Sequence, residues 1–378
     1  MTTIQTQEQR GERRFGLTRN RILTVASLIL FIGFLIWAQN NLDPYKLRIL
    51  NLCAIYAIFA VTFNLIFGFT GQLSLGHAGF AAVGAYTAAL LTMSVAQKQA
   101  NFFLEPLVPL LANVEWPFLP AILVGGVLAA LTGLLIGWPA LRLRGDYLAI
   151  ATLGFSEIIR VICVNWQNVT NGSLGLKGIP GHTNLYWSWG WAIITIFVVK
   201  KLVDSSYGRA LKAIRDDEIA AEALGIHLAR HKILAFTLSS FFVGVGGALL
   251  ANLISTIDPK VFMFFLAYQI VGITVMGGMG SLTGSVVAAV LYTVFLEVLR
   301  PIESPFSIGP INVPGIPGMR MVLFSILLLL VILFYQKGLF GGKEFSWDGL
   351  FAIGGKIRAR FARASVPPAT PPANLKEE

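Results

Sequence analysis

The dominant pattern in the sequence is a series of continuous apolar runs separated by short polar segments. Most runs reach about 18 residues, the length that a membrane-spanning helix needs, and they do not alternate as the strands of a membrane barrel would. The runs predict about ten spans, near residues 22–39, 47–68, 81–96, 119–138, 147–164, 187–199, 233–255, 262–276, 282–299 and 319–335. The expected fold class is therefore all-α, a polytopic integral membrane protein.

The longest polar interruption runs from Ser205 to Lys232 and predicts two short helices. Ser205 and Ser206 can cap a first helix from Tyr207, whereas Asp216 and Asp217 can cap a second that ends at Gly225. The second helix has a small apolar face flanked by basic residues, formed by Ile219, Ala220, Ala221, Ala223, Leu224 and Ile226. Such a helix could dock a soluble partner, and the alternative is a solvated connector.

A second unusual stretch, residues 68–80, is rich in glycine and polar side chains before the next apolar run begins. Irregular backbone survives at membrane depth only against protein or water. Gln72, Ser74 and His77 could therefore face a cavity, although a simple helix-packing seam explains the glycines equally well. Asn64, in the preceding span, is a further buried polar candidate, and the segment 277–281 is a second glycine-rich break.

Two opposite charges, Glu157 and Arg160, fall inside one predicted span. Their spacing of three residues puts them on one helix face, where pairing would lower the cost of membrane charge. They are candidates for the translocation path. The alternative is that Arg160, near the outer end of its span, extends toward the membrane surface.

Composition and charge agree with the pattern of spans. The chain of 378 residues is 55% hydrophobic and 13% charged, which excludes a soluble domain. The net charge of +10 sits beside the spans without any nucleic-acid-reading module, so no nucleic acid partner is expected. By the positive-inside rule, both termini and the loop 203–232 are cytoplasmic. The expected division is a basic segment 1–21, a permease domain 22–336 and a partly disordered tail 337–378.

Several chemistries find no support in the sequence. The chain carries no G-x-x-x-x-G-K-[ST] motif for nucleotide phosphates and no histidine spacing typical of a metal site. Only Glu157 and Glu297 could serve as membrane-embedded acids, and a proton- or sodium-coupled carrier would be expected to have more of them. We therefore expect no catalytic residue, no metal and no cofactor, and any ATP hydrolysis must occur on partner subunits.

Four segments together resemble one family. Residues 63–90, 141–160, 207–226 and 275–284 resemble, in this order, the permeases of branched-chain amino acid ATP-binding cassette (ABC) importers, of the LivM type. Within the third segment, Ala220, Ala221 and Gly225 match the E-A-A-x-x-x-G loop of ABC importer permeases, with Ile219 where many members have Glu. In the outer loop after Arg160 the chain departs from the usual family pattern at residues 170–176.

The resemblance implies a multi-subunit importer in a bacterial inner membrane, surrounded by lipid. Its other parts would be a LivH-type permease in a heterodimer, two cytoplasmic LivG/LivF-type ATPases and a periplasmic substrate-binding protein. The residues expected to couple to an ATPase are Asp216, Asp217, Ala220, Ala221, Glu222 and Gly225. The candidates for the translocation path are Asn64, Gln72, Ser74, His77, Glu157 and Arg160.

The implied substrates are branched-chain or other neutral amino acids. The related importers of urea and short-chain amides share the same sequence landmarks and remain an alternative. An ATP-independent carrier or channel, or a scaffold that transports nothing, would be a different class of protein.

Overall fold

A computed structural model describes residues 2–303, 306–308, 311–313, 315–335, 337–342 and 344. The chain divides into two units, residues 1–37 with 345–378 and residues 38–344. In the first unit, residues 2–37 belong to helix α1 (Thr2–Asn41), so the predicted basic segment 1–21 continues into the first span as one helix. Most of the tail 337–378, which the sequence predicts to be partly disordered, lies outside the described residues.

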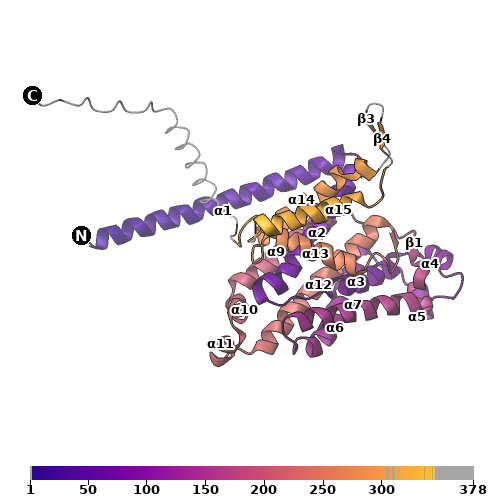
Figure 1. Ribbon diagram of the computed structural model, residues 1–378, viewed down its shortest axis with the longest axis horizontal. Coiled ribbons are helices and arrows are strands. Elements are labelled where there is room, and N and C mark those ends of the chain that lie inside the picture. The colour runs from indigo at the N-terminus through magenta and orange to yellow at the C-terminus, as the bar shows by residue number, and fades with distance from the viewer. Residues whose placement is uncertain are drawn as a thin grey trace, which may run out of the picture. The chain divides into compact units, whose positions relative to one another are not determined.

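The second unit is a bundle of helices with a few very short strands (Figure 1). Its elements, in chain order, are α2 (Pro44–Thr70), α3 (His77–Thr92), α4 (Val95–Asn101), α5 (Pro109–Ala112), α6 (Phe118–Ala140), α7 (Asp146–Asn165), α8 (Gln167–Thr170), η1 (Gly172–Leu174), β1 (Leu176–Lys177), α9 (Leu185–Asp204), α10 (Ser206–Asp216), α11 (Glu218–Ala223), α12 (Leu228–Ile254), β2 (Thr256–Ile257), α13 (Phe264–Gly277), α14 (Leu282–Val298), η2 (Arg300–Glu303), β3 (Phe306–Ile308), β4 (Ile311–Val313) and α15 (Met319–Phe334).

Every predicted span coincides with a helix of the structure. Within the described residues, six helices are long and apolar enough to cross a membrane: Ile22–Asn41, α2, α6, α7, α12 and Leu282–Glu303. The other predicted spans correspond to α3, α9 and the shorter apolar helices α13 and α15. The predicted all-α membrane fold is confirmed, and the chain is a multi-pass membrane protein.

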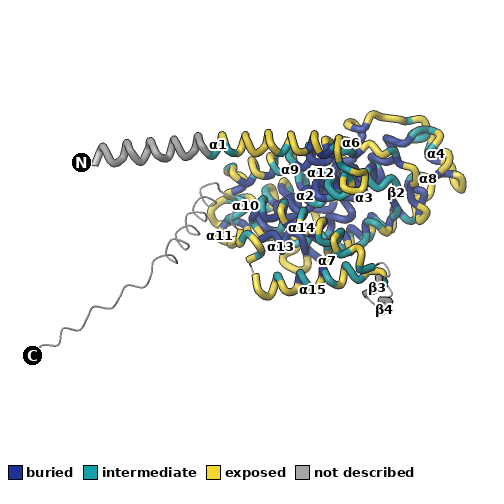
Figure 2. The backbone as a smooth tube through the Cα atoms, turned by 90° about the horizontal axis from the view of Figure 1, so that it is seen from above, coloured by how far each residue is buried: buried dark blue, intermediate teal, exposed yellow. Residues whose placement is uncertain are grey.

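The core of the bundle depends on glycine contacts between α12, α3 and α6. A Cβ atom added at Gly84 of α3 would lie 2.0 Å from the carbonyl oxygen of Gly244 in α12, and one added at Gly247 would lie 2.1 Å from that of Ala81. Small residues at such crossings let helix backbones approach closely, which favours association inside a membrane. Figure 2 shows the resulting buried centre, with exposed residues along the outer helices.

Helices α10 and α11 lie at one end of the bundle, which we call the α11 end (Figure 1). The opposite end, the β1 end, carries α4, α5 and the antiparallel pairing of β1 with β2, in which Leu176 faces Ile257. Helix α12 connects the two ends, and its 27 residues measure about 40 Å at 1.5 Å per residue. The bundle therefore has the length of a membrane domain.

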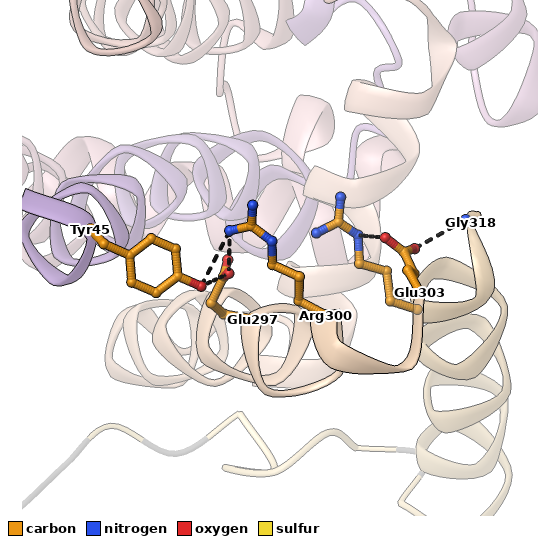
Figure 3. Close-up of polar contacts among 6 residues, drawn as sticks. Tyr45, Glu297, Arg300, Glu303 and Gly318 are labelled. Carbon is orange, nitrogen blue, oxygen red and sulfur yellow. Dashed lines mark hydrogen bonds and ion pairs between the residues drawn. The ribbon is translucent and has the colours of Figure 1, made fainter. Parts of the chain in front are cut away.

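A cluster of charges joins α2, α14 and α15 where α14 ends (Figure 3). The carboxylate of Glu297 accepts hydrogen bonds from the hydroxyl of Tyr45 and from Arg300, the latter at 3.0 Å. A second ion pair, between Arg320 and Glu303, measures 3.4 Å. Glu297 is thus occupied by two partners at a helix end, which makes it a structural residue and not an acid held in mid-membrane.

The glycine contacts predict a difference between two substitutions of the same kind. Gly84→Ala places a methyl group against backbone atoms and should lower the free energy of unfolding by about 1–3 kcal/mol through overpacking. Gly154→Ala, in α7, meets no atom of the described residues within 4 Å and should be neutral or slightly stabilising, because alanine favours helix. Thermal melting and yield of monodisperse protein in detergent measure both. Equal melting temperatures and yields of the two variants would mean that the close contact of α3 with α12 at Gly84 does not contribute to stability.

Candidate coupling site and buried polar break

The two predicted short helices are present as α10 and α11, and local capping explains where they begin. The Ser205 hydroxyl accepts a hydrogen bond from the N–H of Gly208 at 3.4 Å. The carboxylate of Asp217 accepts from the N–H groups of Ile219 and Ala220, at 2.8 and 3.0 Å, as an N-cap does. After α11, Gly225 takes a φ of +83°, which only glycine adopts without strain.

Of the two predicted capping aspartates, only Asp217 caps α11. Asp216 instead ends α10 and forms an ion pair of 2.8 Å with its neighbour Arg215. Both aspartates are exposed.

The carboxylate of Glu218 attaches α11 to the bundle. One oxygen lies 2.5 Å from the ammonium nitrogen of Lys232 in α12, and the other lies 3.4 Å from Nε of Arg144, in the link between α6 and α7. The Lys232 side chain is only 6% exposed, so its charge depends on this partner. Glu218 therefore fixes α11 to two separate elements of the membrane domain.

The outward side of α11 is apolar and unpartnered within the described chain. Ile219 is 72% exposed and Leu224 is 81% exposed. Among the residues expected to couple to an ATPase, Ala220, Glu222 and Gly225 are exposed as well. Ala221, however, is only 1% exposed. Its side chain packs inward, beneath the exposed residues of α11.

Arg215 connects α10 to the end of α2. Its Nη1 donates a hydrogen bond of 3.1 Å to the carbonyl oxygen of Gly68. A Cβ atom at Gly71, where φ is +75°, would lie 3.0 Å from Cγ of Arg215, so the two segments are in close contact. The exposed helix pair is thereby joined directly to the point where α2 gives way to irregular backbone.

Asn64 joins the two glycine-rich breaks to each other. Its Nδ2 donates to the carbonyl oxygen of Ser281 at 2.8 Å and to the hydroxyl of Ser285 at 2.7 Å, and its Oδ1 accepts from the N–H of Gly280 at 2.9 Å. Gly68 leaves the space for this side chain, since a Cβ there would fall 1.7 Å from Oδ1. Asn64 is fully buried and its amide forms three hydrogen bonds to the second break and the start of α14, so it links the two breaks.

Residues 71–76 form irregular backbone inside the bundle. The N–H of Leu75 donates to the hydroxyl of Thr152 in α7 at 3.0 Å, and Nε2 of His77 lies 3.3 Å from the hydroxyl of Ser239 in α12. Ser239 lies about 17 Å along α12 from its start at 1.5 Å per residue. The break is therefore held at depth by protein, as irregular backbone in a membrane must be.

The three polar candidates in this break are all buried, yet they differ in their hydrogen bonding. The Ser74 hydroxyl accepts from the N–H of Gly76 at 3.4 Å. Gln72 is 3% exposed, and among the described residues neither atom of its amide has a hydrogen-bond partner and Nδ1 of His77 is buried without one. Since buried polar groups are rarely left unbonded, the amide of Gln72 and Nδ1 of His77 stand out as polar groups of the break without a partner among the described residues.

The predicted pair of Glu157 and Arg160 is confirmed, with 2.6 Å between Oε2 and Nε. Their side chains are 39% and 25% exposed, so the pair lies on the flank of α7. Its hydrogen bond is internal to the helix and does not reach Asn64, Gln72 or His77.

Sequence reasoning missed the residues that hold α11 in place. Arg215 and Lys232 stood out only as flanking positive charge, and Glu218 and Arg144 were not singled out for this role. The available signal was weak: a lone acid, Glu218, at the start of a helix whose surroundings are rich in bases.

A double-substitution cycle tests the attachment of α11. Glu218→Met leaves the Lys232 ammonium group buried without a partner and should lower the free energy of unfolding by about 2–3 kcal/mol, less than for a wholly buried pair. Adding Lys232→Met should restore most of the loss. Asp43→Asn, which breaks the exposed pair of Asp43 with Lys46, should change the free energy of unfolding by only about 0–1 kcal/mol. Thermal melting in detergent measures the stability of each variant. If the double variant is no more stable than Glu218→Met alone, Lys232 does not depend on Glu218 for its charge.

Comparisons with known proteins place the chain in a family. The family described as branched-chain amino acid transport system / permease component matches residues 45–333. The high-affinity branched-chain amino acid transport system permease protein LivM of Escherichia coli (strain K12) is 33% identical over 316 residues, which cover 75% of this chain and 69% of LivM. LivM of Salmonella typhimurium (strain LT2) is 35% identical with the same coverage.

A second permease of the same transport system is also similar. The permease protein LivH of Escherichia coli (strain K12) is 22% identical over 321 residues, which cover 76% of this chain and 92% of LivH. No solved structure matches the chain significantly. The extent of the family match and the identity to two LivM proteins show that the chain belongs to the family of branched-chain amino acid transport system permeases.

Proposed function

We propose that the protein is the permease subunit of an ABC importer for branched-chain and other neutral amino acids. It pairs with a LivH-type permease in a bacterial inner membrane, receives substrate from a periplasmic binding protein and is driven by two cytoplasmic LivG/LivF-type ATPases. The observation that carries the proposal is the exposed apolar face of α11, which the ion pairs of Glu218 hold against the membrane domain.

The exposed side chains of α11 are suited to bind in a groove on a soluble partner. Ile219 and Leu224 project apolar surface into solvent, and exposed apolar patches mark interaction sites. The positive-inside rule puts this end of the bundle in the cytoplasm, where ATPases are found. ATP hydrolysis then belongs to the partner subunits, and this chain needs no cofactor of its own.

Movement of α11 would reach the interior through two short paths. Glu218 connects α11 to α12, and Arg215 connects α10 to the carbonyl group of Gly68 at the end of α2. Beyond Gly68, the side chain of Asn64 joins α2 to the second break before α14. Closure of the ATPases would thus act on both interrupted helix pairs, α2 with α3 and α13 with α14. It would shift the equilibrium of the transporter toward one access state.

Gln72 and His77 are the best candidates in the break to meet substrate or water during transport. Both are buried in the present conformation, and three of their polar atoms have no partner in the part of the chain that the structure describes. An amide and an imidazole can bind both the ammonium group and the carboxylate of an amino acid. We infer that these atoms gain partners in a conformation in which the break opens.

The test of the proposed function is uptake by the complete transporter, reconstituted in vesicles and offered labelled leucine, alanine and urea. Leucine uptake should require ATP. It should fall at least about tenfold when Ile219→Asp and Leu224→Asp together put charge on the exposed apolar face of α11, because the complex would lose two apolar contacts with the ATPase. His227→Asp, an exposed residue just outside α11, is the matched control and should transport normally.

Each alternative substrate or mechanism has its own outcome in this assay. Uptake of urea alone would keep the importer architecture and overturn the amino acid assignment. Uptake that persists without ATP and in the double variant would contradict an ABC importer and favour an independent carrier or channel.

The break makes a separate prediction about stability and transport. Gln72→Leu removes an unbonded buried amide, so the thermal stability of the assembled protein should stay unchanged or rise. Transport should nevertheless fall if the amide serves the moving substrate. The control, Asn64→Leu, removes three hydrogen bonds between the two breaks and should lower stability by about 2–4 kcal/mol. Normal leucine uptake by a well-folded Gln72→Leu variant would remove Gln72 from the path.

A further inference from the structure

A groove of about 910 Å³ lies between α6 and α12 at the α11 end of the bundle. Its walls are apolar, formed by Trp138, Leu141, Ile233, Leu234, Leu238 and Phe241. The volume is near the top of the range of roughly 300–1,000 Å³ that ligand sites occupy. Because α6 and α12 are long and apolar enough to cross a membrane, we expect a groove between them to border lipid and not bulk water.

Two arginines line the same groove where α6 ends and α12 begins. Arg142 and Arg230 are both exposed, and neither forms an ion pair within the part of the chain that the structure describes. The bases two residues further along each segment, Arg144 and Lys232, behave differently, because both are paired with Glu218. The groove therefore combines an apolar interior with two uncompensated positive charges at one end.

The groove wall also contains an unsatisfied polar atom. The hydroxyl oxygen of Thr237 is buried and has no hydrogen-bond partner in the described structure. That oxygen does not distinguish between occupants, but a helix of a partner permease that filled the groove with apolar side chains would leave both arginines without acceptors. A ligand with an anionic head and a long apolar body satisfies the charges and the walls together.

We propose that this groove binds an anionic phospholipid, with its phosphate between Arg142 and Arg230 and its acyl chains against α6 and α12. Basic residues between membrane helices on the cytoplasmic side are the chemistry that recognises such headgroups. The lipid would join the end of α6 to the start of α12, the same two regions that Glu218 connects through Arg144 and Lys232. A bound lipid would thus support the attachment of α11 from the membrane side.

Native mass spectrometry of the full chain with its permease partner tests the site. The complex is delipidated and then offered equal amounts of phosphatidylglycerol and phosphatidylcholine. The wild type should retain phosphatidylglycerol in preference, by on the order of tenfold. Arg142→Gln combined with Arg230→Gln should abolish the preference. Lys200→Gln combined with Arg209→Gln removes the same charge from exposed positions outside the groove and should preserve it.

A second variant tests the apolar part of the groove. Ala130→Phe fills space on the α6 wall and should reduce retention of both lipids, with the thermal melting point confirming that the protein remains folded. The proposal is overturned if the arginine double variant keeps the preference of the wild type. It is equally overturned if cross-linking from Trp138→Cys finds the partner permease seated in the groove. Neither outcome depends on which substrate the transporter carries.

Discussion

The structure depends on one constraint, that backbone leaving a helix inside a membrane must find its hydrogen bonds within the protein. The chain breaks its helices at 71–76 and again at 278–281, and the amide of Asn64 binds the second break from the helix that precedes the first. Glycines at 68, 71 and 280 give the room and the backbone angles that this arrangement needs.

The exposed helices are attached to the bundle and to this junction by short contacts of charged side chains. Arg215 bonds directly to the carbonyl group of Gly68, four residues after Asn64, while Glu218 holds α11 to α12. A force on α11 therefore does not have to travel through a flexible connector. The last turn of α14 is held separately by Glu297, Arg300 and Tyr45, so the two ends of α14 are restrained by different sets of contacts.

Local features were predictable from the sequence, and long-range ones were not. The apolar runs, the caps at Ser205 and Asp217, the turn at Gly225 and the pairing of Glu157 with Arg160 all depend on residues close together in the chain. The burial of Ala221 depends on how α11 lies on the bundle, and the bonds of Asn64 join residues more than 200 positions apart. Spacing in the sequence also could not show that Ser74 is bonded while the amide of Gln72 is not.

The junction at Asn64 has one more property, which follows from its chemistry. An asparagine amide donates and accepts at once, and no proton is gained or lost in the physiological range. An aspartate of the same shape would accept from Gly280 but could not donate to Ser281 and Ser285 unless protonated. The contact between the two breaks is therefore insensitive to the acidity on either side of the membrane, so a machine built on it can keep the same geometry while the proton gradient across that membrane rises and falls.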